Sequence, residues 1–177
     1  MSIALNALLA RTTGVEEPVV TPEGLLETLA DPHLAAKNAE DGEGVRFDEL
    51  HRTVLGAVEA YGLEGAEVDV FEPADSSPAT LARLQAILAA DHGDQDQVLL
   101  AYYNQGVLIG DWDGPHVSPI GGYVASSGRV LVLDVDPLHR PFWASDHRLL
   151  RAMRRPAPAE HGPLAGETGG LIRLKAA

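Results

Sequence analysis

The spacing of apolar residues changes midway along the chain, and this change constrains the fold more than any other feature. Within residues 47–61, apolar side chains recur at helical spacing, at Phe47, Leu50, Val54, Leu55 and Val58. Residues 98–103 are instead continuously apolar, which is typical of a strand covered on both faces. Helices in the first half and antiparallel strands in the second half predict the α+β fold class.

Capping residues and turn residues predict the other elements. Further helices are expected over residues 3–11, from Thr21-Pro22, from Ser77-Pro78 to Gly93, and from Ser145 or Asp146. Strands are expected around Val68 and Val70, over 116–125 and 129–136, and over 171–174 at the sheet edge. Because the sequence contains no convincing linker, a single domain over residues 1–177 is predicted.

The charge balance excludes several classes of partner. The chain has 13 basic and 26 acidic residues, a formal net charge of −13, and no stripe of Lys or Arg that could displace counterions from nucleic acid. The same charge disfavours anionic membranes, and no apolar run reaches the roughly 20 residues that span a bilayer. The small basic group Arg151, Arg154 and Arg155 is predicted to complement a helix dipole. Since the start lacks a signal peptide pattern, a cytoplasmic protein is expected.

The sequence contains no cysteine, which excludes disulfides, thiolate–metal sites and a cysteine nucleophile within these residues. Its seven histidines show no metal-ligand spacing, and they are residues 33, 51, 92, 116, 139, 147 and 161. Neither a bound metal nor a cofactor is therefore predicted.

The strongest candidate for chemistry is a His–Asp pair. His116 begins a predicted strand, and Asp134 follows it by 18 residues in a buried-type run, Leu131 to Val135. A hairpin turning near residue 126 brings the two close, a few positions out of register, and a bulge at Gly121-Gly122 could reduce the offset. A buried carboxylate is costly unless it is paired, and an imidazole is a natural partner. A catalytic pair and a structural hydrogen bond both remain open on this ground.

These residues lie in a segment that resembles a known family. GPHVSPIGGY followed by VLVLDV is similar to the H-F-S-P-I-G-G-Y … L-I-L-D-V segment of phytochelatin synthases, in which the His is the base and the Asp its orienter. His116 and Asp134 match these two positions at the same separation. Weaker similarities extend over roughly residues 2–153, namely Leu5-Asn6-Ala7-Leu8, Tyr103-Asn104-Gln105-Gly106 and Pro141-Phe142-Trp143.

The resemblance implies a papain-like fold, with N-terminal helices packed on an antiparallel sheet, and a thiol acyltransferase or peptidase. Such an enzyme forms a γ-glutamylcysteinyl thioester from glutathione, releases glycine, and passes the acyl group to another glutathione or to water. The implied partner is a small thiol peptide such as glutathione, and metal ions would enter only as part of thiolate substrates. The resemblance thus connects the chain with metal detoxification, and it leaves homo-oligomerisation open.

The sequence departs from the family pattern in two places. The family's nucleophile lies in a C-G-x-A-S motif, roughly two to three helical turns before the position of Leu5, whereas this sequence starts at Met1. The family's oxyanion-hole glutamine lies further upstream and is also missing from this sequence. Asp136-Pro137 stands where plant-type members have a substrate-reading arginine. Three interpretations follow: an active enzyme whose true start lies upstream of this shortened chain, a pseudoenzyme that acts as a binding or partner module, or another papain-like peptidase or amidase. An in-frame C-G-x-A-S motif upstream would favour the first.

Overall fold

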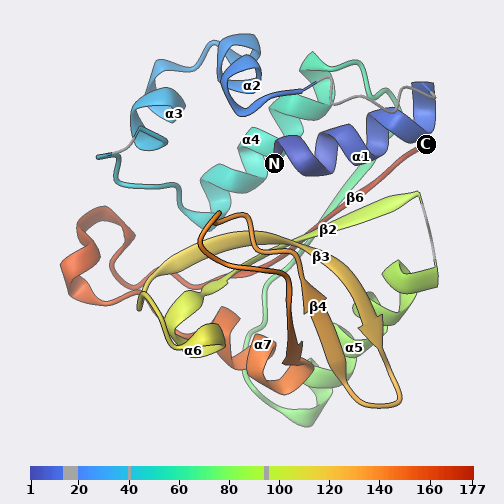
Figure 1. Cartoon of the computed structure of the whole chain (residues 1–177), viewed down its shortest axis with the longest axis vertical. Coiled ribbons are helices and arrows are strands. Elements are labelled where there is room, and N and C mark those ends of the chain that lie inside the picture. The colour runs from blue at the N-terminus through green and yellow to red at the C-terminus, as the bar shows by residue number, and fades with distance from the viewer. Residues whose placement is uncertain (14–19, 40, 94–95) are drawn as a thin grey trace.

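The computed structural model describes residues 1–13, 20–39, 41–93 and 96–177 (Figure 1). The helical elements are α1 (Ser2–Thr13), α2 (Pro22–Leu29), α3 (Pro32–Lys37), α4 (Phe47–Ala60), α5 (Pro78–Gly93), α6 (Gln105–Ile109), α7 (Asp146–Arg154) and the 3-10 turn η1 (Ala159–Leu164). The strands are β1 (Glu67–Phe71), β2 (Gln97–Asn104), β3 (Pro115–Val124), β4 (Arg129–Val132), β5 (Phe142–Ser145) and β6 (Gly170–Lys175). Within the described residues they form one antiparallel sheet in the order β1-β6-β2-β3-β4-β5.

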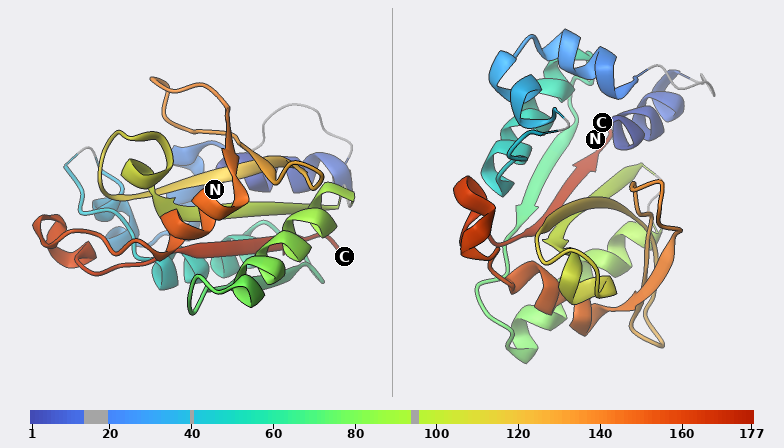
Figure 2. Two further views of the ribbon diagram at one scale, coloured as in Figure 1. Left: turned by 90° about the horizontal axis from the view of Figure 1, so that it is seen from below. Right: turned by 60° about the vertical axis from the view of Figure 1, so that its left-hand side comes forward.

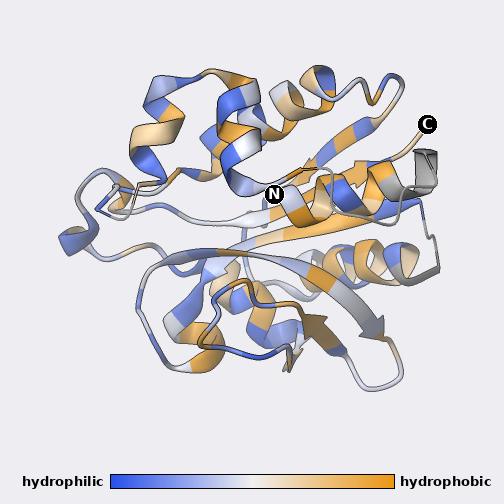
Figure 3. Cartoon of the chain, turned by 45° about the horizontal axis from the view of Figure 1, so that its top comes forward, coloured by the Kyte–Doolittle hydropathy of each residue, from blue (hydrophilic) through white to orange (hydrophobic). Residues whose placement is uncertain are grey.

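Helices cover both faces of this sheet, as the right-hand view of Figure 2 shows. Leu100 and Tyr102 of β2 face a core formed with α1 and α4, whereas Leu99, Ala101 and Tyr103 face a core formed with α5 and α7. Figure 3 shows the resulting apolar colouring along the central strands. This double burial explains why residues 98–103 are continuously apolar. The predicted α+β class is confirmed, and across the described ranges no helix is long and apolar enough to cross a bilayer.

The prediction that residues 171–174 form an edge strand was wrong. β6 lies between β1 and β2, and its Leu171, Ile172 and Leu174 are buried. Residues 171–174 include one charged residue, Arg173. In the structure its guanidinium pairs with Asp69 of the neighbouring strand β1, which is the true edge.

Three further differences affect the region around the candidate site. The predicted strand 129–136 ends at Val132, because Asp136-Pro137 begins a turn in which the Leu138 amide donates to Asp136 Oδ1 over 2.8 Å. The short helix α6 and the strand β5 were not predicted. Elements of four or five residues carry too few positions for a period to be recognised.

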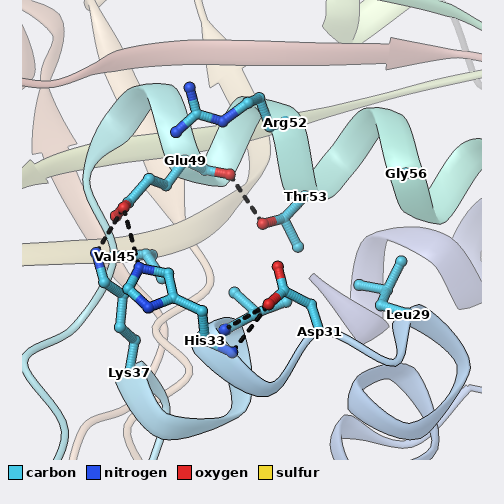
Figure 4. A pocket seen from close by; sticks show the side chains of 10 residues that line it. Leu29, Asp31, His33, Lys37, Val45, Glu49, Arg52, Thr53 and Gly56 are labelled. Carbon is cyan, nitrogen blue, oxygen red and sulfur yellow. Dashed lines mark hydrogen bonds and ion pairs between the residues drawn. The ribbon is translucent and has the colours of Figure 1, made fainter.

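Two carboxylates hold the beginning of α4. Glu167, from the segment before β6, accepts the Phe47 amide over 2.9 Å and pairs with the Arg46 guanidinium at 3.0 Å. Glu49 accepts the Arg46 amide over 2.9 Å and also pairs with Lys37 Nζ at 2.5 Å. Figure 4 shows Lys37 and His33 of α3 converging on Glu49 in a cavity of about 380 Å³. The charges in this cavity therefore serve to join α3 to α4.

We expect Glu49→Gln to destabilise the protein by about 1–2 kcal/mol at pH 7. Partial burial alone would raise the pKa of Glu49, but the hydrogen bonds from the Arg46 amide and Lys37 outweigh it and hold the pKa below its usual value. A lowered folded-state pKa contributes stability above the unfolded pKa, and this contribution disappears as the pH falls through the folded value.

Urea unfolding at pH 7 and pH 3 measures the effect. The difference between wild type and variant should shrink at pH 3, whereas Glu59→Gln, an exposed site on the same helix, should change little at either pH. An equal difference at both pH values would contradict this account of Glu49.

Candidate active site

His116 lies at the start of β3, where its backbone pairs with Tyr103 of β2. The two rings meet edge to face with centroids 5.7 Å apart, and the Tyr103 hydroxyl is 2.9 Å from Ser118 Oγ. Burial raises the pKa of Tyr103, and the nearby Asp134 carboxylate adds to this rise. The Tyr103 side chain is therefore uncharged and is held in a fixed position beside the His116 imidazole.

The loop before His116 is tied to the end of β2 by Asn104. The Asn104 Oδ1 atom accepts the Val107 amide over 3.0 Å and so caps α6, and its Nδ2 atom donates to Asp113 over 2.7 Å. The Gln105 amide donates to the Gly114 carbonyl over 2.9 Å. Hydrogen bonds from Asn104 and Arg155 hold the pKa of Asp113 below its usual value. These contacts fix the point at which β3 begins, and with it the position of His116.

Asp134 reaches the same place from the end of β4. The register of β3 and β4 shifts between Ile120 and Gly122, so the bulge expected at Gly121-Gly122 is present. A Cβ atom on Gly121 would lie 2.8 Å from the Leu133 side chain, which explains a glycine at this point. The Leu133 amide still donates to the Pro119 carbonyl over 2.9 Å. Asp134 therefore lies opposite Ser118 of the neighbouring strand β3, and its side chain contacts His116 diagonally across the two strands.

The two side chains are in direct contact. His116 Nε2 lies 2.8 Å from Asp134 Oδ1, which also accepts the Asp136 amide over 3.0 Å. The Asp134 side chain is fully buried and the His116 side chain is 16% exposed. Because a carboxylate oxygen accepts, the neutral imidazole carries its hydrogen on Nε2 and keeps a lone pair on Nδ1. The predicted proximity of His116 and Asp134 is confirmed.

A second imidazole, which the sequence did not reveal, lies on the other side of the carboxylate. His139 Nδ1 is 3.5 Å from Asp134 Oδ2 and 3.3 Å from Gln105 Nε2, and His139 Nε2 is 3.1 Å from Asp111 Oδ2. The turn at Asp136-Pro137 brings this residue back, with the His139 amide donating to the Asp136 carbonyl over 3.0 Å. An Asp-Pro turn directly after a buried Asp is the signal that could have pointed to it.

His116 lines a cleft of about 580 Å³. Its apolar wall includes Tyr102, Trp112, Val117 and Val135, and segments 42–45 and 160–164 complete it. Val117 packs against the same apolar cluster as Met1, whereas the neighbouring His116 ring packs against Tyr103, which belongs to the core on the other face of the sheet. In the part of the chain that the structure describes, no group of three or more His, Asp or Glu side chains is placed to hold a metal ion.

An imidazole that lines a cleft and is backed by a buried carboxylate is the arrangement that acid–base catalysis requires. The family model of phytochelatin synthase matches residues 24–161, a range that includes His116 and Asp134. The chain therefore belongs to the phytochelatin synthase family, a family of γ-glutamylcysteine transferases. No match was found among curated proteins.

The pair predicts a coupled effect on stability. We expect His116→Ala and Asp134→Ala each to cost about 1–3 kcal/mol, because each change removes a charge-assisted hydrogen bond and the first leaves a buried carboxylate without its closest partner. The double variant should cost less than the sum by about 1 kcal/mol or more, as measured by urea unfolding.

His147→Ala is the matched control, since that side chain is exposed on α7 and should contribute less than about 0.5 kcal/mol. Additive effects of the two substitutions at positions 116 and 134 would show that the contact contributes nothing to folding.

Proposed function

We propose that this chain forms the acid–base part of a papain-like thiol acyltransferase that acts on glutathione or a related γ-glutamyl peptide. The observation that carries the proposal is the 2.8 Å contact between a cleft-lining His116 and a fully buried Asp134 carboxylate, inside the range that matches the family. His116 acts as the base, and Asp134 orients it and stabilises its protonated form.

In this mechanism His116 Nδ1 takes the proton of a thiol, and the resulting thiolate attacks the carbonyl carbon of the peptide bond before glycine. The carbon–nitrogen bond then breaks, and the imidazolium returns the proton to the departing amine of glycine. The thioester is resolved when His116 takes a proton from the amine of a second peptide or from water, which attacks the same carbon. The carbon–sulfur bond then breaks, and the imidazolium returns the proton to the leaving thiolate. Transferase and peptidase outcomes thus differ only in the nucleophile of this last step.

The thiol must come from outside residues 1–177, because they contain no cysteine. The turn before α1 is a suitable place for it. The family resemblance places the cysteine there, because Leu5-Asn6-Ala7-Leu8 is similar to the helix that follows the family's nucleophile. A helix amino terminus favours negative charge and lowers the pKa of a thiol placed there. These observations support a nucleophile at that end of α1.

We assign His139 a positioning role in the same reaction. Its Nδ1 atom lies 3.5 Å from Asp134 Oδ2, the oxygen that His116 does not contact, without a hydrogen bond between the two. The ring is held by Asp111 at Nε2 and by Gln105 Nε2 at Nδ1, so it limits the space in which the Asp134 carboxylate can rotate. Because His139 acts through Asp134, its loss should affect the chemical step more than substrate binding.

A second candidate function is that of a binding module, which binds the same peptide but catalyses no reaction. The observation that favours it is a cleft and a His–Asp pair in a sequence without a thiol. Calorimetric titration of residues 1–177 with glutathione, together with the following activity measurement, distinguishes the two, because only the enzyme releases glycine.

The direct test is to precede Met1 with a segment that continues α1 and carries the Cys-Gly-x-Ala-Ser motif. We expect this protein to release glycine from glutathione. His116→Ala and Asp134→Asn in that background should each lower the rate by about 10³–10⁴-fold. The matched control carries Ser in place of the motif's Cys. If the folded, Cys-containing protein releases no glycine between about pH 5 and pH 10, a range that covers the usual titration of His and Cys, the proposal fails.

For the positioning role, we expect His139→Gln in the Cys-containing protein to lower kcat about tenfold with KM changed by less than about twofold. His147→Gln provides a control, since this residue lies on α7, outside the cleft. A matching rise in KM with unchanged kcat would assign His139 to substrate binding instead.

A further inference from the structure

Four arginines line a surface concavity of about 820 Å³. It borders α6 and α7, which lie next to each other (Figure 1). The arginines are Arg148, Arg151, Arg154 and Arg155, and the carboxylates of Asp111 and Asp113 line the same hollow. We propose that this concavity, named here the arginine hollow, binds a small dianionic ligand, either a phosphate monoester or a dicarboxylate.

Three of the four arginines lie on α7, and Arg155 is the residue that follows its end. Leu149, Leu150, Ala152 and Met153 turn inward to the core, so Arg148, Arg151 and Arg154 are left on the outer side of the helix. A helix dipole explains Arg151 and Arg154, which lie in the last turn. It does not explain Arg148, which lies in the first turn, where the dipole disfavours a cation. Binding of an anion is a role that Arg148 and the exposed Arg151 can share.

Two of these arginines, Arg148 and Arg151, have no carboxylate partner among the described residues. Arg148 Nε donates to the Val107 carbonyl over 2.9 Å. No hydrogen bond or ion pair of the Arg151 guanidinium is seen in the described part of the chain. Arg154 donates to the carbonyls of Pro73, over 3.1 Å, and Ala74, and it also interacts electrostatically with the Asp75 carboxylate. Arg155 forms an ion pair, with its Nη2 3.1 Å from Asp113 Oδ2.

The lining carries more positive than negative charge. Four guanidinium groups and the two carboxylates of Asp111 and Asp113 give the lining residues a formal charge of +2, within a chain of −13. The Asp75 carboxylate, next to the lining residue Ser76, interacts with Arg154 and reduces this excess to +1. Guanidinium groups bind phosphate and carboxylate oxygens in pairs of parallel hydrogen bonds, and Ser76 adds a hydroxyl to the lining. A phosphate monoester or a dicarboxylate presents several anionic oxygens and can therefore pair with more than one guanidinium at once, which acetate cannot.

The arginine hollow and the cleft share a loop but present different surfaces. Trp112 lines the cleft, whereas its neighbours Asp111 and Asp113 line the hollow. Binding in the hollow needs neither His116 nor a thiol, so the inference stands or fails independently of the proposed reaction.

The test is calorimetric titration of residues 1–177 at pH 7 and constant ionic strength with inorganic phosphate, succinate and acetate. We expect saturable binding of phosphate or succinate with a Kd below about 10 mM, and at least about tenfold weaker binding of acetate. The phosphate and succinate arms identify which dianion is preferred. Arg151→Gln and Arg148→Gln should each weaken binding by about five- to tenfold.

Arg173→Gln is the matched control, because its guanidinium pairs with Asp69 on the edge strand and lies outside the hollow. It should change the affinity by less than about twofold. Circular dichroism confirms that each variant is folded, and Arg151→Gln removes no contact seen in the fold. Absence of saturable binding of both dianions, or an equal loss in Arg173→Gln, would overturn the proposal.

Discussion

The fully buried carboxylate of Asp134 sets the geometry of this end of the molecule. A charge removed from water has to be met by hydrogen bonds or opposite charges, and here the partners come from several segments of the chain. His116 from β3 and the Asp136 amide satisfy Oδ1, whereas Oδ2 has no hydrogen-bond partner among the described residues and lies 3.5 Å from His139 Nδ1. The β3–β4 bulge allows the contact between His116 and Asp134, and the Asp136-Pro137 turn brings His139 next to Asp134. An acid–base pair therefore results from the way the sheet accommodates one charge.

The segment after Asp134 is where this sequence departs from the plant-type family pattern, and the structure gives that departure a consequence. Asp136 and Pro137 stand in place of an arginine and fold into a tight turn. The turn returns His139 to Asp134, while Asp111 contacts Nε2 of the ring and Gln105 contacts the same Nδ1 that faces Asp134. His116 and Asp134, the proposed base and its orienter, lie within the range that matches the family, and the turn adds a second imidazole next to Asp134.

Much of this arrangement could be predicted because local signals were strong. Thr21 and Ser145 cap helices as their sequences indicated, and an Asp within a buried-type strand pointed to a partner such as His116. The central position of β6 could not be predicted, since strand order depends on which apolar faces meet, and Arg173 finds its counter-charge 104 residues away. His139 and the arginine hollow were missed for the same reason. Their partners are distant in sequence, and each residue alone has an ordinary role as a surface charge.

The central claim is that His116 lies where it can deprotonate a thiol at the amino end of α1. The most direct measurement is the ultraviolet absorbance of the thiolate as a function of pH, in the protein carrying Cys-Gly-x-Ala-Ser before Met1. Our account predicts that thiolate forms well below the usual thiol pKa of about 8.5, and that His116→Gln moves the titration back towards that value. Identical titration curves with and without His116 would contradict it.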